Sequence, residues 1–188
     1  MRKFILAAAV CATSLPAMAQ STADGFNWGG VYVGLAASYI DGKNRWDEDG
    51  SYKLDGRTRG AAFVGYNQQH GRFVFGLETA NTFGKFNEDG YPDYRYKNMQ
   101  DFRVRVGHTY DRVMVYLAGG YSRARFAEPD DRITMNGFNL GLGVDYALTD
   151  HLIVGFDYTH RRFKRTSIDD DHIKGRVDSA SLRLSYLF

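Results

Sequence analysis

The last twelve residues of the chain, Val177 to Phe188, alternate between apolar and polar side chains. A two-residue period predicts a β-strand with one apolar face and one polar face. The polar face carries serines and Arg183, and the chain ends on an aromatic ring, which is stable at a membrane–water interface. The apolar face consists of Ala180, Leu182, Leu184, Tyr186 and Phe188.

The same alternation recurs along the chain and predicts eight strands. Three short turns, 68–72, 109–112 and 148–151, alternate with four long polar segments, 41–57, 84–97, 127–134 and 164–175. Strands of about ten residues match a tilted bilayer crossing, and the alternation of connections is typical of outer-membrane barrels. We therefore expect an all-β fold, an eight-stranded antiparallel up-and-down transmembrane β-barrel with long extracellular loops and short periplasmic turns. The expected strands are 29–39, 59–67, 73–83, 101–108, 113–126, 136–146, 152–161 and 177–188.

The N-terminus has the features of an export signal. Arg2 and Lys3 precede a short apolar run, and Ala17-Met18-Ala19 forms a small-residue cleavage site, which predicts a cleaved signal peptide over residues 1–19. The barrel domain is then 20–188, and its lack of cysteine rules out disulfides because Cys11 is removed. Without Arg2 and Lys3 the 24 basic residues fall to 22, equal to the 22 acidic ones, so charge gives no reason to expect nucleic acid.

Periodicity alone does not say which face of the strands lies inside. A soluble barrel of the lipocalin type, or a secreted sandwich, would bury the apolar face. The signal peptide, terminal Phe188, the unequal connections and the many small residues on the polar face favour a membrane barrel. Small residues beside long charged ones suit the narrow interior that eight strands enclose.

Short glycine-rich motifs resemble the opacity-type, porin-family group of small outer-membrane β-barrels of Gram-negative bacteria. They are G-G-V-Y-V-G-L-A at 29–36, V-G-Y-N at 64–67, R-V-R-V-G at 103–107, Y-L-A-G-G at 116–120 and G-L-G-V-D-Y-A-L-T-D at 141–150. The resemblance covers nearly the whole mature chain but not the loops, where such barrels differ in function. It implies the cell outer membrane as location, and membrane lipid, lipopolysaccharide and the assembly machinery as partners. Leu184, Tyr186 and Phe188 match the closing-strand signal that this machinery reads.

The polar strand faces predict a charged interior. Four positive and four negative residues fall on these faces, and buried charges cost several kcal/mol unless they are paired. We therefore expect a salt-bridged plug rather than an open conduit. The predicted interior network is Arg59, Glu78, Asp101, Arg103, Arg105, Asp145, Asp157 and Arg183.

The strand ends carry basic and aromatic residues. Basic side chains at the outer ends are predicted to bind lipopolysaccharide phosphates, which arginine recognises bidentately; the alternative is a charged rim that only marks the end of the membrane. The basic residues are Arg123, Arg125, Arg161, Arg162, Lys164 and Arg165. The expected aromatic belts are Tyr66, Tyr110, Tyr146, Tyr186 and Phe188 on the periplasmic side, and Tyr39, Phe83, Phe126 and Phe163 on the outer side.

Nothing in the sequence indicates an enzyme, a cofactor or a metal site. The lipid A deacylase type needs a histidine followed two residues later by Ser-Asn, whereas Arg161 and Arg162 follow His160. The histidines lack metal-ligand spacing, although haem capture through His160 or His172 stays open because some relatives bind haem. We expect a structural role in envelope integrity and surface display. The alternatives are a binding protein, adhesin or haem receptor, acting through its loops, and a narrow passive porin.

Overall fold

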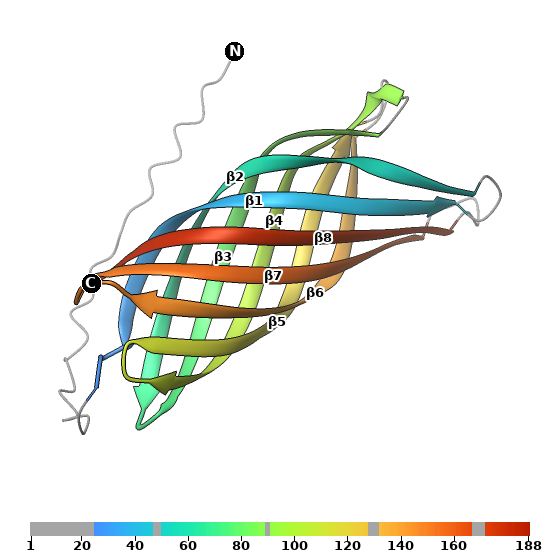
Figure 1. Ribbon diagram of the computed structural model, residues 1–188. Helices are drawn as coiled ribbons and strands as arrows, with labels where there is room; N and C mark the ends of the chain where they lie inside the picture. Colours follow the sequence, from blue (N-terminus) through green and yellow to red (C-terminus); the bar gives the residue numbers. More distant parts are fainter. Residues whose placement is uncertain (1–24, 47–49, 89–90, 128–131, 167–171) are drawn as a thin grey trace, which may run out of the picture.

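The computed structural model describes residues 25–46, 50–88, 91–127, 132–166 and 172–188. Consecutive strands pair antiparallel and the first pairs with the last, which closes the barrel (Figure 1). The predicted eight-stranded up-and-down fold is thus confirmed, whereas the predicted signal peptide lies outside the described residues. The strands are β1 Gly30–Trp46, β2 Gly50–His70, β3 Phe73–Glu88, β4 Tyr91–Tyr110, β5 Val113–Ala127, β6 Arg132–Ala147, β7 Leu152–Thr166 and β8 His172–Leu187.

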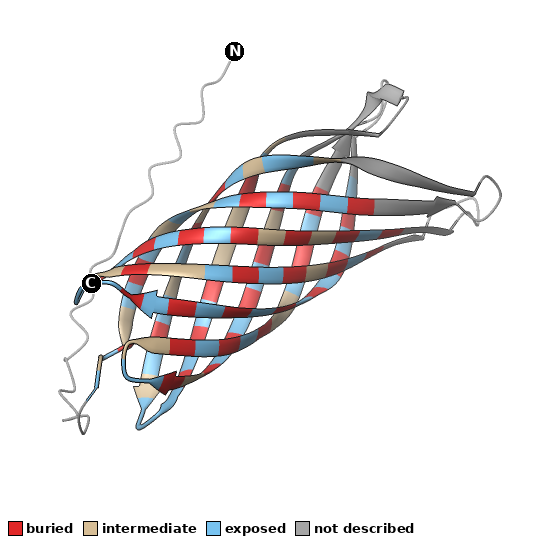
Figure 2. Ribbon diagram, in the orientation of Figure 1, coloured by how far each residue is buried: buried red, intermediate tan, exposed pale blue. Residues whose placement is uncertain are grey.

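The exposed face of the barrel wall is apolar. Buried and exposed residues alternate along the strands (Figure 2). Leu35, Phe138 and Leu182 on the outer face are 67%, 76% and 68% exposed, whereas Glu78 and Arg105 on the inner face are 4% and 3% exposed. A soluble barrel of the lipocalin type would show the opposite arrangement. The polar face therefore lines the lumen and the apolar face meets lipid.

Tight turns join the strands at the end of the barrel where β8 finishes. The β2–β3 and β4–β5 connections are two residues each, with Gly71 at φ 57° and Asp111 at φ 52°. Positive φ is easiest for glycine and is tolerated by aspartate in hairpin turns. Between β6 and β7, Thr149 Oγ1 accepts a hydrogen bond of 2.9 Å from the Leu152 N–H. In outer-membrane barrels the short turns are periplasmic, so we call the opposite end the outer end.

The strands are longer at the outer end than predicted. Residues 41–46, 50–57, 84–88 and 91–97, assigned to long loops from sequence, belong to β1, β2, β3 and β4. Likewise residues 132–134, 164–166 and 172–175 belong to β6, β7 and β8. The predicted bounds of these loops are therefore wrong, because most of the residues assigned to them continue the strands.

The sequence pattern did not predict these outer strand ends because the polarity of the two faces of the barrel wall is reversed there. Near the outer end the inner face carries buried apolar side chains, and the outer face carries exposed polar ones such as Arg123 and Arg162. This is the arrangement of a barrel in water and not in lipid. We call the buried group the outer apolar set: Ile40, Met99, Ala124, Met135, Phe163 and Val177.

The aromatic belts follow the predicted faces with one exception. Tyr66, Tyr110, Tyr146, Tyr186, Phe188, Tyr39 and Phe83 are exposed on the outer face. Phe163 is only 1% exposed and belongs to the lumen, because it shares its strand face with Asp157. Its assignment to the outer belt was wrong. The side chain of Phe126 lies outside the described part of the structure.

A charge placed in the middle of the apolar band tests this orientation. Leu184 lies between Leu182 and Tyr186 in the apolar part of the exposed face of β8, and an arginine at the bilayer midplane costs about 2–4 kcal/mol. Ala180 is on the same face of β8, between Tyr39 and Tyr158 of the neighbouring strands. At this interfacial depth Ala180→Arg should cost only about 0–1 kcal/mol. Urea unfolding of both variants in lipid vesicles would contradict the orientation if Ala180→Arg proved the more damaging.

Candidate functional site

Six buried charged side chains meet across the middle of the lumen. We call them the central ionic layer: Glu78 on β3, Arg103 and Arg105 on β4, Asp145 on β6, Asp157 on β7 and Arg183 on β8. Glu78 binds all three arginines: Arg103 and Arg183 closely, and Arg105 through Nη1 at 3.2 Å. The register places Glu78 directly opposite Arg103, and Arg183 reaches it across the lumen from β8.

The two aspartates complete the layer. Asp157 accepts hydrogen bonds from Arg103 Nη1 at 3.1 Å and Tyr116 OH at 2.9 Å, and lies 3.9 Å from Arg183 Nη1. Asp145 accepts a hydrogen bond of 2.6 Å from Arg105 Nη2. Three guanidinium groups thus face three carboxylates in a charge-balanced cluster. Balance matters because an unpaired charge in this setting is far more costly than a paired one.

Aromatic rings pack against two arginines of the central ionic layer, Arg105 and Arg183. The Arg105 guanidinium carbon lies 3.8 Å from the ring centroid of Tyr116, and that of Arg183 lies 3.9 Å from the centroid of Phe63. Both distances are within the range of a cation–π interaction. Tyr32 OH accepts a hydrogen bond of 2.8 Å from Arg105 and donates one of 2.9 Å to Glu78. These contacts fix the guanidinium groups in place.

Glycines on the lumen face make room for the two tyrosines. A Cβ on Gly65 would collide with the Tyr32 ring, and a Cβ on Gly143 would collide with the Tyr116 ring. The absence of a side chain lets each ring lie flat against the neighbouring strand. The glycine-rich motifs of the sequence therefore have a packing role next to the ionic layer.

A second ionic layer lies further toward the outer end. Arg161 donates to both carboxylate oxygens of Asp101, through Nη2 at 2.6 Å and Nε at 3.1 Å. Ser122 donates to Asp101 at 2.5 Å, and Ser179 accepts from Arg161 at 2.7 Å. The prediction that Arg161 contacts lipopolysaccharide is therefore wrong. Arg161 is 5% exposed because it shares the inward face of β7 with Asp157 and Thr159.

Arg59 is the one predicted network member outside both ionic layers. It is half-buried on the lumen side of β2, nearer the outer end than Ala61, and its Nη1 donates to the Thr58 carbonyl at 3.1 Å. The other seven predicted interior residues all lie in the lumen and form ion pairs. Two kinds of interior residue were missed from the sequence, Arg161 and the uncharged partners, although the alternation of inward and outward positions along each strand could have found them. The uncharged partners are Tyr32, Tyr116, Ser122, Thr159 and Ser179.

An apolar cluster fills the periplasmic end of the lumen. Residues 25–29 precede β1, and Trp28 among them is fully buried. The Trp28 N–H donates to Gln69 Oε1 at 2.7 Å, and its indole Nε1 lies 3.4 Å from the Asp111 carbonyl oxygen. We call this cluster the apolar floor. Besides Trp28 it contains Val74, Met114, Ala147, Ile153 and Leu187.

The predicted rim residues are only partly described. Arg123 and Arg162 are exposed on the outer face, whereas the side chains of Arg125, Lys164 and Arg165 lie outside the described part. Arg162 Nε donates to His160 Nε2 at 3.2 Å, and His160 Nδ1 donates to Asp178 Oδ1 at 2.7 Å. Among the described residues no group of three or more His, Cys, Asp or Glu side chains could hold a metal ion, and no helix could span a membrane.

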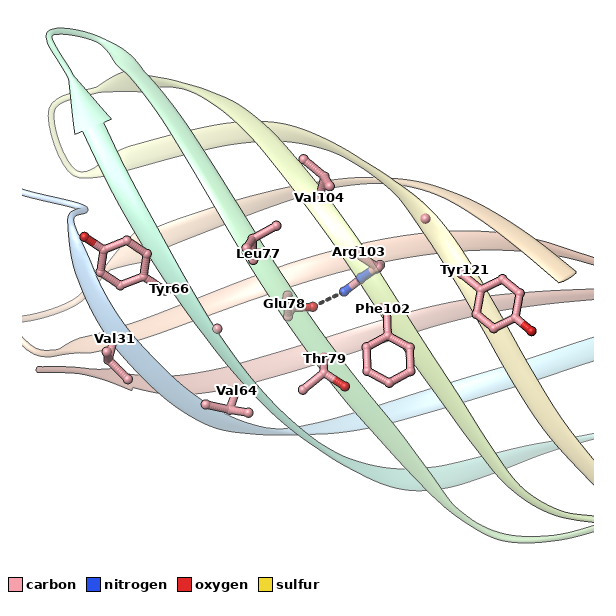
Figure 3. Close-up of a pocket in the computed structure, with 12 residues that line it drawn as sticks. Val31, Val64, Tyr66, Leu77, Glu78, Thr79, Phe102, Arg103, Val104 and Tyr121 are labelled. Atoms are coloured by element: carbon pink, nitrogen blue, oxygen red, sulfur yellow. Dashed lines mark hydrogen bonds and ion pairs between the residues drawn. The ribbon is translucent and has the colours of Figure 1, made fainter. Parts of the chain in front are cut away.

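A shallow groove of about 720 Å³ crosses the outer side of the wall over β1 to β5 (Figure 3). Its sides are formed by apolar residues, among them Leu77, Phe102 and Val104. Glu78 and Arg103, which form an ion pair, also line it (Figure 3).

An apolar outer band around a filled polar lumen defines a transmembrane β-barrel of the outer-membrane type. Comparison with known families agrees with this class. The chain belongs to the outer membrane protein beta-barrel domain family, whose model matches residues 5–188. It is thus an integral outer-membrane protein with a charged network buried inside its barrel.

Known relatives are small outer-membrane proteins. The chain is 27% identical over 150 residues to the 22 kDa outer membrane protein of Rhizobium leguminosarum bv. viciae, covering 77% of this chain and 69% of that protein. It is 25% identical to the 31 kDa outer-membrane immunogenic protein of Brucella melitensis, covering 97% and 93% of the two chains. The crystal structure of Neisserial surface protein A matches with a TM-score of 0.58 and 18% identity, covering 88% and 100%. The last match supports the fold alone.

Proposed function

We propose that the protein is a closed barrel that contributes to the integrity of the outer membrane and displays its outer hairpins at the surface. The observation that supports closure is the succession of buried side chains through the lumen. Along β7 alone, Ile153 of the apolar floor is followed by Asp157, Arg161 and Phe163, all buried. A barrel filled in this way is a rigid wall element and not a conduit.

Surface display is supported by the outer ends of the strands and by the relatives. The hairpins continue beyond the apolar band, and their outer face there is polar. The Brucella relative is named an outer-membrane immunogenic protein, which fits a family whose outer segments are accessible at the cell surface. We propose the same exposure for this chain.

The alternatives have less support. In a narrow porin the central arginines and carboxylates would be hydrated, whereas here they bind each other. Haem ligation by His160 would require a free ring nitrogen, and both nitrogens are engaged by Asp178 and Arg162. The side chain of His172, the other candidate haem ligand, lies outside the described part of the structure. We also propose that the protein is not an enzyme, since guanidinium groups hold the described lumen carboxylates that could act as acid or base.

Two partners follow from this role. The exposed residues Leu184, Tyr186 and Phe188 on β8 would present the closing-strand signal to the assembly machinery. Lipopolysaccharide would surround the outer half of the barrel, where exposed arginines lie above the apolar band.

Planar-bilayer recording of the refolded wild-type protein tests closure. We expect no steady conductance above that of protein-free bilayers, because the buried side chains of the apolar floor and the ionic layers fill the lumen. A trimeric porin refolded and reconstituted in the same lipid serves as the positive control. Steady wild-type channels at neutral pH would refute the closed barrel and favour the passive porin.

A further inference from the structure

Two exposed arginines lie directly opposite each other on the lipid-facing side of the β7–β8 hairpin. Arg162 on β7 is the register partner of Arg176 on β8, and both side chains are exposed. Like charges directly opposite on one face destabilise a sheet. Arg162 donates to His160, and no hydrogen bond joins Arg176 to another side chain in the described part of the chain.

The pair belongs to a longer row of basic positions across neighbouring strands. In the register Arg176 is also opposite Lys43 of β1, and Lys43 is opposite Lys53 of β2. Two residues further out, Lys164 is opposite Lys174, which is opposite Arg45. β1, β7 and β8 lie side by side on the barrel wall (Figure 1). The first row of basic positions thus spans β7, β8, β1 and β2, and the second spans β7, β8 and β1.

The acidic residues near the pair do not neutralise it. Asp178 and Asp41 are opposite each other one step toward the membrane, and Asp178 is already bonded to His160 and Tyr158. The side chains that the structure describes here are thus two exposed arginines and two carboxylates, one of which is held by His160 and Tyr158. The opposed arginines can therefore take up an anion from outside the chain.

The height of the pair indicates where the anions are. Arg162 is opposite Phe138 of β6, whose side chain is 76% exposed in the apolar band. Tyr158, also exposed, is four residues below Arg162 on the same face, about 13 Å along the strand. The two guanidinium groups therefore lie at the level of lipid headgroups, just beyond the acyl chains.

We propose that Arg162 and Arg176 form a clamp for a phosphate group of an outer-leaflet glycolipid. The planar guanidinium fork matches phosphate oxygens bidentately, and an anion between two opposed arginines turns their repulsion into attraction. This site refines the lipopolysaccharide contact proposed above: it includes Arg176 and excludes Arg161. It does not depend on closure of the lumen.

Binding to glycolipids of defined phosphorylation tests the clamp. Wild-type protein in neutral phospholipid nanodiscs is titrated with bisphosphorylated lipid A, with dephosphorylated lipid A and with inorganic phosphate. The variants are Arg162→Gln, Arg176→Gln and the double change. Arg123→Gln is the matched control, because Arg123 is an exposed outer-face arginine on β5 whose register partners, Gln100 and Asn136, are uncharged.

We expect the double variant to bind bisphosphorylated lipid A at least tenfold more weakly than wild type, and Arg123→Gln to bind as wild type does. Dephosphorylated lipid A should not distinguish wild type from the double variant. Without glycolipid the double variant should resist urea at least as well as wild type, because the like-charge pair is gone; with glycolipid the order should reverse. Unchanged lipid A affinity in the double variant, or an equal loss in Arg123→Gln, would overturn the clamp.

Inorganic phosphate separates the two sources of the anion. If it bound as tightly as bisphosphorylated lipid A, the ligand would be free phosphate and the glycolipid assignment would be wrong. Planar-bilayer conductance of the double variant, expected to equal that of wild type, keeps this result separate from the test of lumen closure.

Discussion

Replacing Glu78 by alanine is expected to lower the free energy of unfolding by about 3–5 kcal/mol, the range for breaking a buried ion pair by removing one partner. Glu78 is the shared acceptor of Arg103, Arg105 and Arg183, so its loss leaves three guanidinium groups facing two carboxylates. Arg183 is affected most, since its other carboxylate contact, with Asp157, is 3.9 Å long. Urea unfolding in lipid vesicles measures the loss.

Two further variants separate charge from volume. Glu78→Gln retains the size and an acceptor oxygen but removes the charge, and should account for most of the loss. Adding Arg183→Met restores the balance at two positive and two negative groups. The double variant should therefore be more stable than Glu78→Gln alone, which is a coupling of the kind that double-mutant cycles detect. If Arg183→Met and Glu78→Gln were simply additive, the central layer would not act as one charge-balanced unit.

Glu78→Ala also tests how the lumen is closed. Because the apolar floor and the outer apolar set remain on either side of the ionic layer, Glu78→Ala alone should conduct no more than wild type in planar bilayers. A marked increase in conductance would mean that the ionic layer is the main barrier to ions.

The membrane half of the barrel could be predicted from sequence because lipid imposes one rule on it. Residues that face lipid must be apolar and their neighbours face the lumen, so a two-residue period assigns both faces at once. Glu78, Arg103 and Arg183 were placed in the lumen in this way. Which carboxylate meets which arginine was beyond prediction, because Arg183 reaches Glu78 across the lumen, from strands that are not neighbours.

The prediction failed for the outer half of the strands because, where the barrel wall leaves the lipid, the outward face becomes polar and the inward face apolar. Ile40 and Phe163 are apolar and point inward, whereas Arg162, between two inward-facing residues, is exposed. A search for apolar residues on the outward face therefore ends each strand too early. Strand parity carried from Asp157 through Thr159 would have placed both Arg161 and Phe163 in the lumen.

Residues 25–28 precede the first predicted strand, 29–39, and the sequence predicted no structure for them. Nothing in the five residues before β1 predicts that Trp28 packs into the periplasmic end of the lumen. The two aromatic rings, Phe26 and Trp28, were the available signal, and they pack edge to face with centroids 4.9 Å apart. Their role depends on the opening between the tight turns, which exists only in the closed fold.

Trp28→Ala is expected to cost about 3–5 kcal/mol, the range for removing a large aromatic side chain from a core. The indole is fully buried among apolar side chains that include Met114, Ile153 and Leu187. Its removal leaves a cavity at the end of the barrel, and residues 25–29 lose their main attachment. The unfolding midpoint in urea should fall accordingly, as followed by the heat-modifiable band on gels, a readout that does not rely on tryptophan fluorescence.

Trp28→Phe and Phe26→Ala are the matched controls. Trp28→Phe retains a ring and loses only part of the volume and the long indole contact with Asp111, so it should cost much less than Trp28→Ala. Phe26 is only partly buried against the cluster, so Phe26→Ala should fall between wild type and Trp28→Ala. Hydrogen exchange at the Trp28 amide, which donates to Gln69, should be slow in wild type and fast in Phe26→Ala only if the segment detaches as a unit. Wild-type stability in Trp28→Ala would show that the floor is held by the strand residues alone, and that residues 25–29 take no part in closing the barrel.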